Sequence, residues 1–221
     1  MQRLLALVLF VFTIVFVACG EDAGVRGEFG DDRSSATTCF EITVEKGYNF
    51  EIFKYEASRP NASSGSTGTG AGMPACSEEG VLPWVNITRG EAGEACQRSG
   101  FDLCTMDQWT LGCGGADKQA FPYGMRDKPG YCNEFQSGTG RLEPTGSRGR
   151  CVSPYEVYDM IGNVAEWVLD RSDEGAGRYR GYSYQLVALR PTASPQCDSG
   201  YHAPLADWDQ PYVGFRCCRP F

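Results

Sequence analysis

The chain has 221 residues, of which 42% are hydrophobic and 22% charged, and its formal net charge is -8. This length is sufficient for one domain with a complete core. The acidic balance argues against a nucleic-acid partner, because phosphate binding requires clustered Lys and Arg and the sequence contains no basic run. We therefore expect a single globular domain that does not bind nucleic acid.

The first residues read MQRLLALVLFVFTIVFVACG, with an apolar run from Leu4 to Ala18 that only Thr13 interrupts. Such a run is typical of a secretory signal, here residues 1–18. Cys19 directly follows the small Ala18, as at a bacterial lipoprotein processing site, where the cysteine is acylated. We expect an exported protein of the cell envelope, anchored to the outer membrane or cell surface by lipid on Cys19. The alternative is an ordinary cleaved signal with a free thiol at Cys19.

Residues 19–38 are rich in Gly, Ser, Thr and acidic residues and contain almost no large apolar side chains. Such a segment cannot bury enough surface to order itself, so we expect a flexible tether. The globular domain then comprises residues 39–221.

Apart from Cys19, the chain contains ten further cysteines. They are Cys39, Cys76, Cys96, Cys104, Cys113, Cys132, Cys151, Cys197, Cys217 and Cys218. In an exported chain, a dense and even set indicates a disulfide framework. Zinc is disfavoured because His202 is the only histidine and no Cys-x-x-Cys pair occurs.

The beginning of the domain predicts strands and then loops. Apolar residues alternate within Phe40–Val44 and, less regularly, within Phe50–Tyr55, so two strands joined around Lys46–Tyr48 are expected. The run Asn61–Gly72, which reads NASSGSTGTGAG, predicts a flexible surface loop. From Phe121 onwards, frequent Gly and Pro predict short strands and long loops.

Two capping boxes predict two short helices. Thr88 precedes Glu91 by three residues, and Ala92, Ala95 and Cys96 then share one face before the run ends at Gly100. Thr105 and Gln108 repeat the pattern ahead of an apolar face that stops at Gly114.

The stretch YEVYDMIGNVAEWVLD, residues 155–170, combines a turn with two carboxylates. Asp159 and Glu166 lie on either side of Gly162, so a loop that bends at the glycine can bring both acids and nearby backbone carbonyls to one point. An oxygen-only site of this kind suits Ca²⁺. The alternative is a plain turn into a strand, in which Trp167 and Val168 enter the core and the acids are solvated.

Several segments occur in the order found in one known family. They read FEIFKYEAS, EACQRSGFDLCTMDQW, FPYG, YCN, YDMIGNVAEWVLD, RGYS and VGFRCC. As a set, they resemble the formylglycine-generating enzyme, or sulfatase-modifying factor, domain over most of residues 39–221. The resemblance implies an α+β, C-type-lectin-like fold with little regular secondary structure. Asp102, Cys104 and Gln108 depart from the family's motif, and we expect them to leave its turn unchanged.

The resemblance also implies a structural calcium site. Family members bind Ca²⁺ through positions matched here by Asp159, Gly162, Val164 and Glu166. A second family calcium site would begin at Asn133 and Glu134, but the expected Asp is missing from the segment that follows, up to Ser147.

Catalysis is where the sequence departs most from the family. The family enzyme oxidises a substrate cysteine with a copper-binding Cys-x₄-Cys pair placed after a Gly-Ser turn, matched here by Gly181–Ser183. Between Ser183 and Gly214 this chain has only Cys197. A single thiol cannot supply two soft ligands to Cu(I), so we expect no catalytic residue and no copper.

The resemblance assigns the remaining cysteines to structure. It implies two bridges, Cys96 with Cys217 and Cys113 with Cys197. We add three further predictions, Cys132 with Cys151, Cys104 with Cys218, and Cys39 with Cys76.

These observations predict a non-catalytic binding or envelope-associated module with a protein or glycan ligand. One alternative is an active formylglycine-generating oxidoreductase with altered chemistry, which a free thiol or bound copper would distinguish. Another is a lectin-like recognition protein whose specificity lies in the loop Tyr184–Asp209.

Overall fold

The computed structural model describes residues 39, 41–44, 50–135, 139–171, 176–185, 196–202 and 209–220. The predicted signal, Cys19 and the tether lie outside the described residues, as does most of the Tyr184–Asp209 loop. Residues Thr37–Phe221 form one compact unit. Within the described part of the chain, neither helix is long and apolar enough to cross a bilayer.

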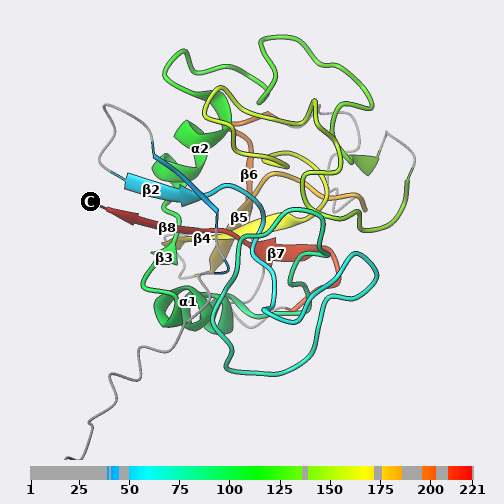
Figure 1. Cartoon of the computed structure of the whole chain (residues 1–221). Helices are drawn as coiled ribbons and strands as arrows, with labels where there is room; N and C mark the ends of the chain where they lie inside the picture. The colour runs from blue at the N-terminus through cyan, green and yellow to red at the C-terminus, as the bar shows by residue number, and fades with distance from the viewer. Residues whose placement is uncertain are drawn as a thin grey trace, which may run out of the picture. The chain divides into compact units, whose positions relative to one another are not determined.

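The first sheet brings the two ends of the domain together (Figure 1). Its strands are β1 (Ile42–Val44), β2 (Phe50–Phe53), β3 (Asp102–Leu103) and β8 (Cys217–Pro220). Their order is β1-β2-β8-β3 and all pairs are antiparallel. The two strands expected near the start of the domain are thus β1 and β2, and the C-terminal strand pairs beside them.

The second sheet contains the end of the stretch 155–170, whose turn leads into its strand β4. Its strands are β4 (Ala165–Arg171), β5 (Gly177–Arg180), β6 (Gly200–His202) and β7 (Val213–Phe215), in the order β6-β5-β4-β7. β4 and β7 are parallel, with Glu166 opposite Gly214. Because β7 ends at Phe215 and β8 begins at Cys217, Arg216 is the one residue between β7 of the second sheet and β8 of the first.

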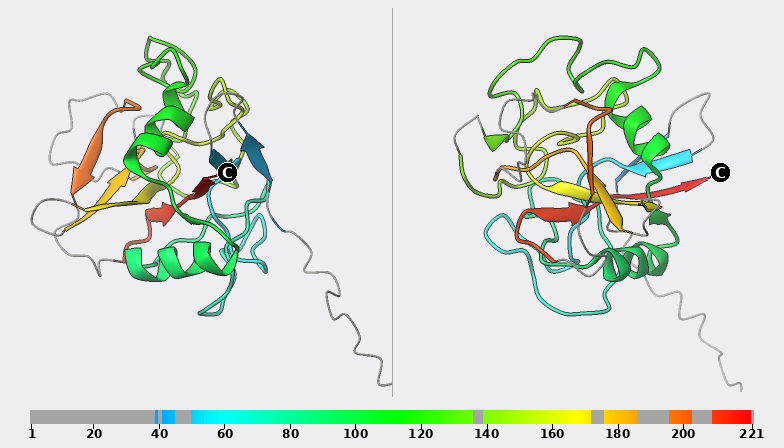
Figure 2. Two further views of the ribbon diagram at one scale, coloured as in Figure 1. Left: turned by 90° about the vertical axis from the view of Figure 1, so that its left-hand side faces the viewer. Right: turned by 180° about the vertical axis from the view of Figure 1, so that it is seen from behind.

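Both predicted helices are present, and they lie on opposite sides of the strands in all views (Figure 2). They are α1 (Arg89–Arg98) and α2 (Met106–Gly114), and each begins with a complete capping box, at Thr88 and Thr105. In α1 the cap residue donates its backbone N–H to Glu91 Oε2 at 2.9 Å. Helix α1 ends at Arg98 and has Ser99 as its C-cap, just before the expected end at Gly100.

Strand β4 separates two clusters of buried apolar side chains. Trp167 packs with Trp84, Phe215 and the buried face of α1, whereas the next residue, Val168, packs with Trp109 of α2. Successive side chains of a strand point to opposite faces, which explains this division. The alternative reading, a plain turn into a strand, placed Trp167 and Val168 in the core, and this part of it is confirmed.

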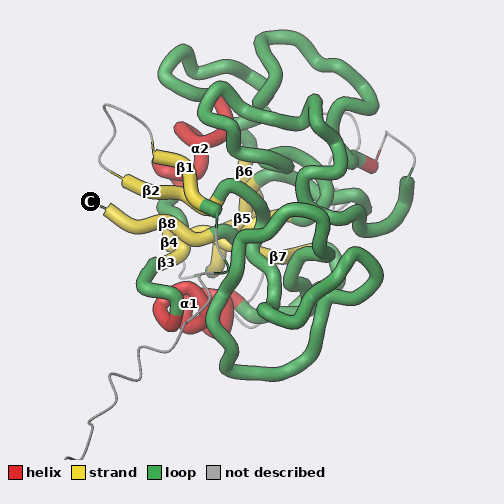
Figure 3. The backbone as a smooth tube through the Cα atoms, in the orientation of Figure 1, coloured by secondary structure: helices red, strands yellow, loops and turns green. Residues whose placement is uncertain are grey.

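Five disulfides fasten this framework, which otherwise contains long loops (Figure 3). They join Cys39 to Cys76, Cys96 to Cys217, Cys104 to Cys218, Cys113 to Cys197, and Cys132 to Cys151. These are the five pairs expected from the sequence and the resemblance. The bridges at Cys217 and Cys218 leave β8 on opposite faces, one to α1 and one to the segment before α2.

The glycine-rich run 61–72 is a loop, as predicted, but side chains hold it in a defined conformation. Arg59 donates from Nη1 to the Thr67 carbonyl at 3.1 Å. The Asn61 amide both donates to the Thr69 carbonyl, at 3.1 Å, and accepts from the Thr69 N–H, at 3.3 Å. The predicted surface loop is therefore present, and Arg59 and Asn61 at its edge hydrogen-bond to its backbone, while its flexibility stays a prediction.

Candidate functional site

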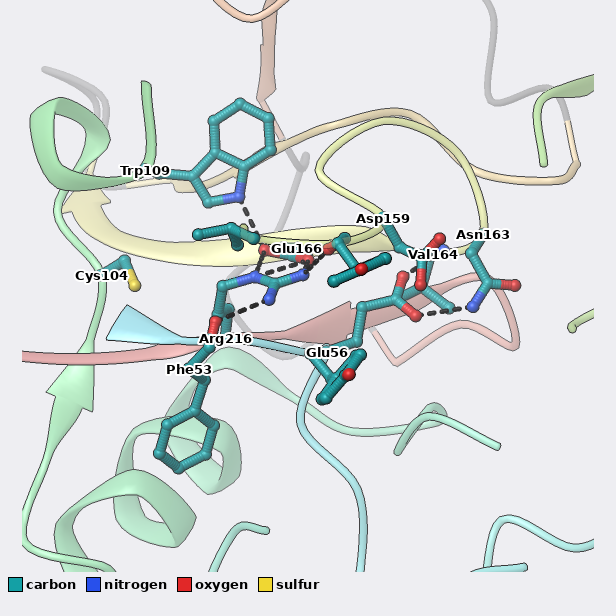
Figure 4. A network of polar contacts seen from close by, with 12 residues as sticks. Phe53, Glu56, Cys104, Trp109, Asp159, Asn163, Val164, Glu166 and Arg216 are labelled. Atoms are coloured by element: carbon teal, nitrogen blue, oxygen red, sulfur yellow. Dashed lines mark hydrogen bonds and ion pairs between the residues drawn. The ribbon is translucent and has the colours of Figure 1, made fainter. Parts of the chain in front are cut away.

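A buried network of polar side chains surrounds the junction of the two sheets (Figure 4). Its centre is an ion pair between Glu166 of β4 and Arg216, with 2.8 Å between Nη2 and Oε1 and 3.1 Å between Nε and Oε2. Trp109 of α2 donates its indole N–H to Glu166 Oε2 at 2.6 Å. The Glu166 carboxylate thus accepts hydrogen bonds from two nitrogens of the Arg216 guanidinium and from the neutral indole of Trp109.

The remaining donors of Arg216 go to the backbone. Its Nη1 donates to the Phe53 carbonyl and its Nη2 to the Tyr158 carbonyl, each at 2.8 Å. One guanidinium therefore connects β2, β4 and the segment before the turn. Because Arg216 is fully buried, these bonds are made without competition from water.

Glu56 is a member of this network that the sequence did not reveal. Its Oε1 accepts from the Val164 N–H at 3.0 Å, and its Oε2 accepts from Asn163 Nδ2 at 2.6 Å. Burial raises the pKa of Glu56 well above its usual value, and the nearby charges of Asp159 and Glu166 raise it further. The residues that follow β2 read KYEASR, and nothing in this local sequence distinguishes Glu56 from a solvated acid.

Asp159 lies at the start of the turn and is also buried. Its Oδ2 accepts from the Gly146 N–H at 2.6 Å. Burial raises the pKa of Asp159 to about 7, although that hydrogen bond and the charge of Arg216 act in the opposite direction. The sequence-based alternative of solvated acids is therefore wrong, since both Asp159 and Glu166 are enclosed.

Gly162 allows the turn to pass close to another segment. Its φ is 81°, and a Cβ at this position would lie 2.6 Å from the Asn133 carbonyl oxygen. That oxygen accepts from the Asn163 N–H at 2.8 Å. The two predicted metal segments, at Gly162 and at Asn133, are thus packed against each other.

The network contains more buried carboxyl groups than buried guanidinium groups. Three buried carboxylates, those of Glu56, Asp159 and Glu166, face the single guanidinium of Arg216. A divalent ion would offset the excess negative charge, but at Glu166 it would share the carboxylate with Arg216. The calcium ligands Asp159, Gly162, Val164 and Glu166 therefore stay a prediction.

The residues of the second predicted metal site have other structural contacts. Asn133 Nδ2 donates to the Arg141 carbonyl at 3.0 Å and to Asn163 Oδ1 at 3.1 Å, and Asn133 Oδ1 accepts from the Thr139 hydroxyl. Burial raises the pKa of Glu134 to about 7. Asn133 therefore organises the loop that follows it.

No cysteine among the described residues has a free thiol, because each one belongs to a disulfide. The one described group with closely spaced Cys or acidic ligand atoms contains Cys39, Cys76 and Glu78. Its two sulfurs are bonded to each other, so they are not thiolate ligands.

A cavity of about 520 Å³ lies beside the predicted recognition loop. It is bordered by Asp107 and Thr110 of α2, by Lys118 and Gln119, and by Gln196 and Asp198. This volume lies in the usual range for small-molecule pockets.

Comparisons with known proteins agree with this architecture. Residues 33–221 match the family described as "Sulfatase-modifying factor enzyme 1-like domain". The chain is 30% identical over 110 residues to "Inactive C-alpha-formylglycine-generating enzyme 2" of Mus musculus, a match that covers 45% of this chain and 35% of that protein. The chain thus spans about a third of the length of this relative.

Solved structures share the C-type-lectin-like fold. PvdO from Pseudomonas aeruginosa superimposes with a TM-score of 0.54 and 16% identity, over 78% of this chain and 80% of that one. "Treponema denticola variable protein 1" gives a TM-score of 0.56 and 13% identity, over 81% and 91%. At these identities, the likeness concerns the fold.

Proposed function

Because the chain belongs to the sulfatase-modifying factor enzyme 1-like domain family, we propose that it is a member without oxidase activity that serves as a binding or envelope-associated module. In this proposal, the protein is exported and is held on a membrane by lipid at Cys19. The five disulfides support an oxidising compartment, where such bridges form and persist.

The observation that carries this proposal is the state of the cysteines. An oxidase of the type implied by the resemblance needs two thiolates within reach of each other to hold Cu(I). Here Cys197 is bonded to Cys113, and the sequence from Tyr184 to Gln196 contains no cysteine. The family relative whose name describes it as inactive supports the same reading.

A thiol count tests the proposal. The chain from Gly20 to Phe221 is denatured without reductant and titrated with a thiol reagent, and the expected result is no reactive thiol. Reduction before titration is the control and should release all ten cysteine thiols of this segment. A reactive pair of thiols, or stoichiometric copper in the native protein, would instead favour an active oxidoreductase with altered chemistry.

A second candidate function is ligand recognition by the loop Tyr184–Asp209. The cavity beside Gln196 and Asp198 favours it, because the loop contributes to the cavity wall. Arg180 supports this wall by donating from Nη1 to the Asp198 carbonyl. If the loop recognises a ligand, replacing Gln196 or Asp198 should change the affinity for that ligand. Substitutions at the exposed Glu156 should leave the affinity unchanged.

A further inference from the structure

The loop that follows helix α2, residues 121–131, presents exposed side chains outside the buried network and the cavity described above. Its tip, residues 125–130, reads MRDKPG, and all six residues are exposed. Met125 is 67% exposed, the largest value among the exposed large apolar side chains in the described part of the chain. Figure 1 shows the loop, in green, at the edge of the molecule beyond α2.

Hydrogen bonds and a disulfide hold the base of this loop. The Tyr123 hydroxyl accepts from the Lys128 N–H at 3.5 Å. Arg148 donates from Nη1 to the Gly130 carbonyl at 3.0 Å and to the Cys132 carbonyl at 2.9 Å. The disulfide at Cys132 fastens the end of the loop to the segment that contains Arg148. The exposed tip is therefore displayed on a defined base.

Aromatic rings and a cation complete that base. The buried Phe121 ring stacks on the Tyr123 ring, with 5.5 Å between the ring centres. The Tyr123 ring in turn meets the half-buried Tyr131 ring edge to face at 5.0 Å. The Arg150 guanidinium lies 5.2 Å from the centre of the Tyr131 ring, so Arg150 belongs to the same surface as the loop.

This surface is positively charged, although the chain as a whole has a net charge of -8. Arg126, Lys128 and Arg150 are exposed, and the exposed acid among them is Asp127. The Asp127 carboxylate accepts from the Tyr123 hydroxyl at 3.5 Å. Within the described part of the chain, neither Arg126 nor Lys128 forms an ion pair. An anionic surface would therefore be attracted to this loop and repelled by much of the remaining protein.

We propose that the tip, residues 125–130, contacts an anionic membrane surface. Arg126, Lys128 and Arg150 lie near phospholipid phosphates, and Met125 enters between the headgroups. Exposed apolar side chains beside several cations are the combination that binds such a surface. A projecting tip can meet a flat surface, whereas an acidic protein segment would need a pocket to cover Met125.

This inference rests on the proposed lipid anchor, which holds the domain near a membrane, so that a weak contact is sufficient. It adds to the anchor by naming the face of the domain that turns toward the lipid. The two proposals are tested separately, because incorporation of a fatty acid at Cys19 does not depend on this loop.

Vesicle sedimentation tests the contact with the chain from Gly20 to Phe221, which lacks Cys19 but contains the whole compact unit. The probe vesicles contain phosphatidylglycerol mixed with phosphatidylcholine, and vesicles of phosphatidylcholine alone are the control. We expect the chain to sediment with the anionic vesicles at low salt and to be released as salt is added, because ions screen the attraction. It should stay in solution with the neutral vesicles.

Three variants identify the surface that binds. Arg126→Gln with Lys128→Gln should weaken binding about 25-fold, because each Lys or Arg near an anionic surface contributes about fivefold. Met125→Gln should weaken it about fivefold, since each CH₂ that leaves water contributes about fourfold. Arg98→Gln with Arg171→Gln is the matched control, because it removes the same charge from exposed positions outside the loop. Its binding should stay within about twofold of the parent chain.

The proposal is overturned if the chain does not sediment with anionic vesicles at low salt. It is equally overturned if the double variant in the tip binds as tightly as the control variant. Binding to soluble polyglutamate without binding to vesicles would identify an acidic polypeptide as the partner instead. Melting temperatures of all variants should match the parent chain, because every substituted side chain is exposed, so a loss of binding does not come from unfolding.

Discussion

Glu166 and Arg216 form an ion pair in which the two side chains are 1% and 0% exposed. The pair sits where β7 passes into β8, so it lies between the two sheets as well as beside the turn at Gly162. An ion pair in such a place mainly specifies one arrangement, because either partner alone is an uncompensated buried charge. We regard it as the structural centre of the domain.

Removing Arg216 should therefore destabilise the protein strongly. We expect Arg216→Met to lower the free energy of unfolding by about 3–5 kcal/mol, since it leaves Glu166 without its counter-charge. The double variant Glu166→Gln with Arg216→Met should recover part of this loss. Urea unfolding of the single and double variants gives the comparison, and a loss below about 1 kcal/mol for Arg216→Met would contradict the central role of the pair.

The stability of the calcium-free protein should fall as the pH rises. The pKa of Asp159 is raised from 3.8 to about 7, so the folded state holds this proton more tightly than the unfolded state does. The resulting stabilisation is complete below the unfolded pKa and is lost as the pH rises through about 7. Melting temperatures in chelator should be lower at the alkaline end of this range.

Asp159→Asn is the matched variant, because it keeps the oxygen that accepts from Gly146 but does not ionise. Its melting temperature should depend less on pH across the same range. Equal pH dependence in the variant and the parent would show that Asp159 does not titrate in this window.

Calcium should raise the melting temperature, because a divalent cation offsets the excess negative charge of Glu56, Asp159 and Glu166. At a calcium concentration of about 100 times Kd, the expected stabilisation is about 2.7 kcal/mol. Glu166→Gln should lose most of the response, whereas Glu94→Gln, in an exposed ion pair with Arg98, should keep it. Identical melting curves in calcium and in chelator would leave the stretch as a turn into β4.

Local sequence signals predicted the helices and strands well. The capping boxes at Thr88 and Thr105 specify helix starts through bonds between residues three positions apart, so they are visible in the sequence. The disulfides followed from the family resemblance together with an even cysteine count, and the pairs in the structure are the expected ones.

The buried network could not be predicted in the same way. Glu56 accepts hydrogen bonds from Asn163 and Val164, which are more than 100 positions away in the sequence. The residues next to Glu56 in the sequence do not distinguish it from a solvated acid. The same holds for the glycine-rich loop, whose conformation depends on Arg59 and Asn61 at its edge. The sequence therefore did not reveal which polar side chains bond to partners far away along the chain.

If lipid on Cys19 anchors the protein, replacing Cys19 should move the protein out of the membrane fraction. In cells that express the full chain, the protein should appear in the membrane fraction and incorporate a labelled fatty acid. Cys19→Ser should lose the label and leave the membrane fraction, while Cys39→Ser, a matched cysteine substitution in the domain, should keep the label. A parent chain that carries no fatty acid would favour an ordinary cleaved signal.

The most direct test of the proposed loss of oxidase activity is incubation of the chain from Gly20 to Phe221 with a sulfatase-type Cys-x-Pro-x-Arg peptide, with copper supplied. Mass spectrometry then measures conversion of the peptide cysteine to formylglycine. We predict no conversion, because Cys197 is bonded to Cys113 and no thiol pair follows Ser183. Formation of the aldehyde in amounts that depend on copper and vanish in Cys197→Ser would contradict the account.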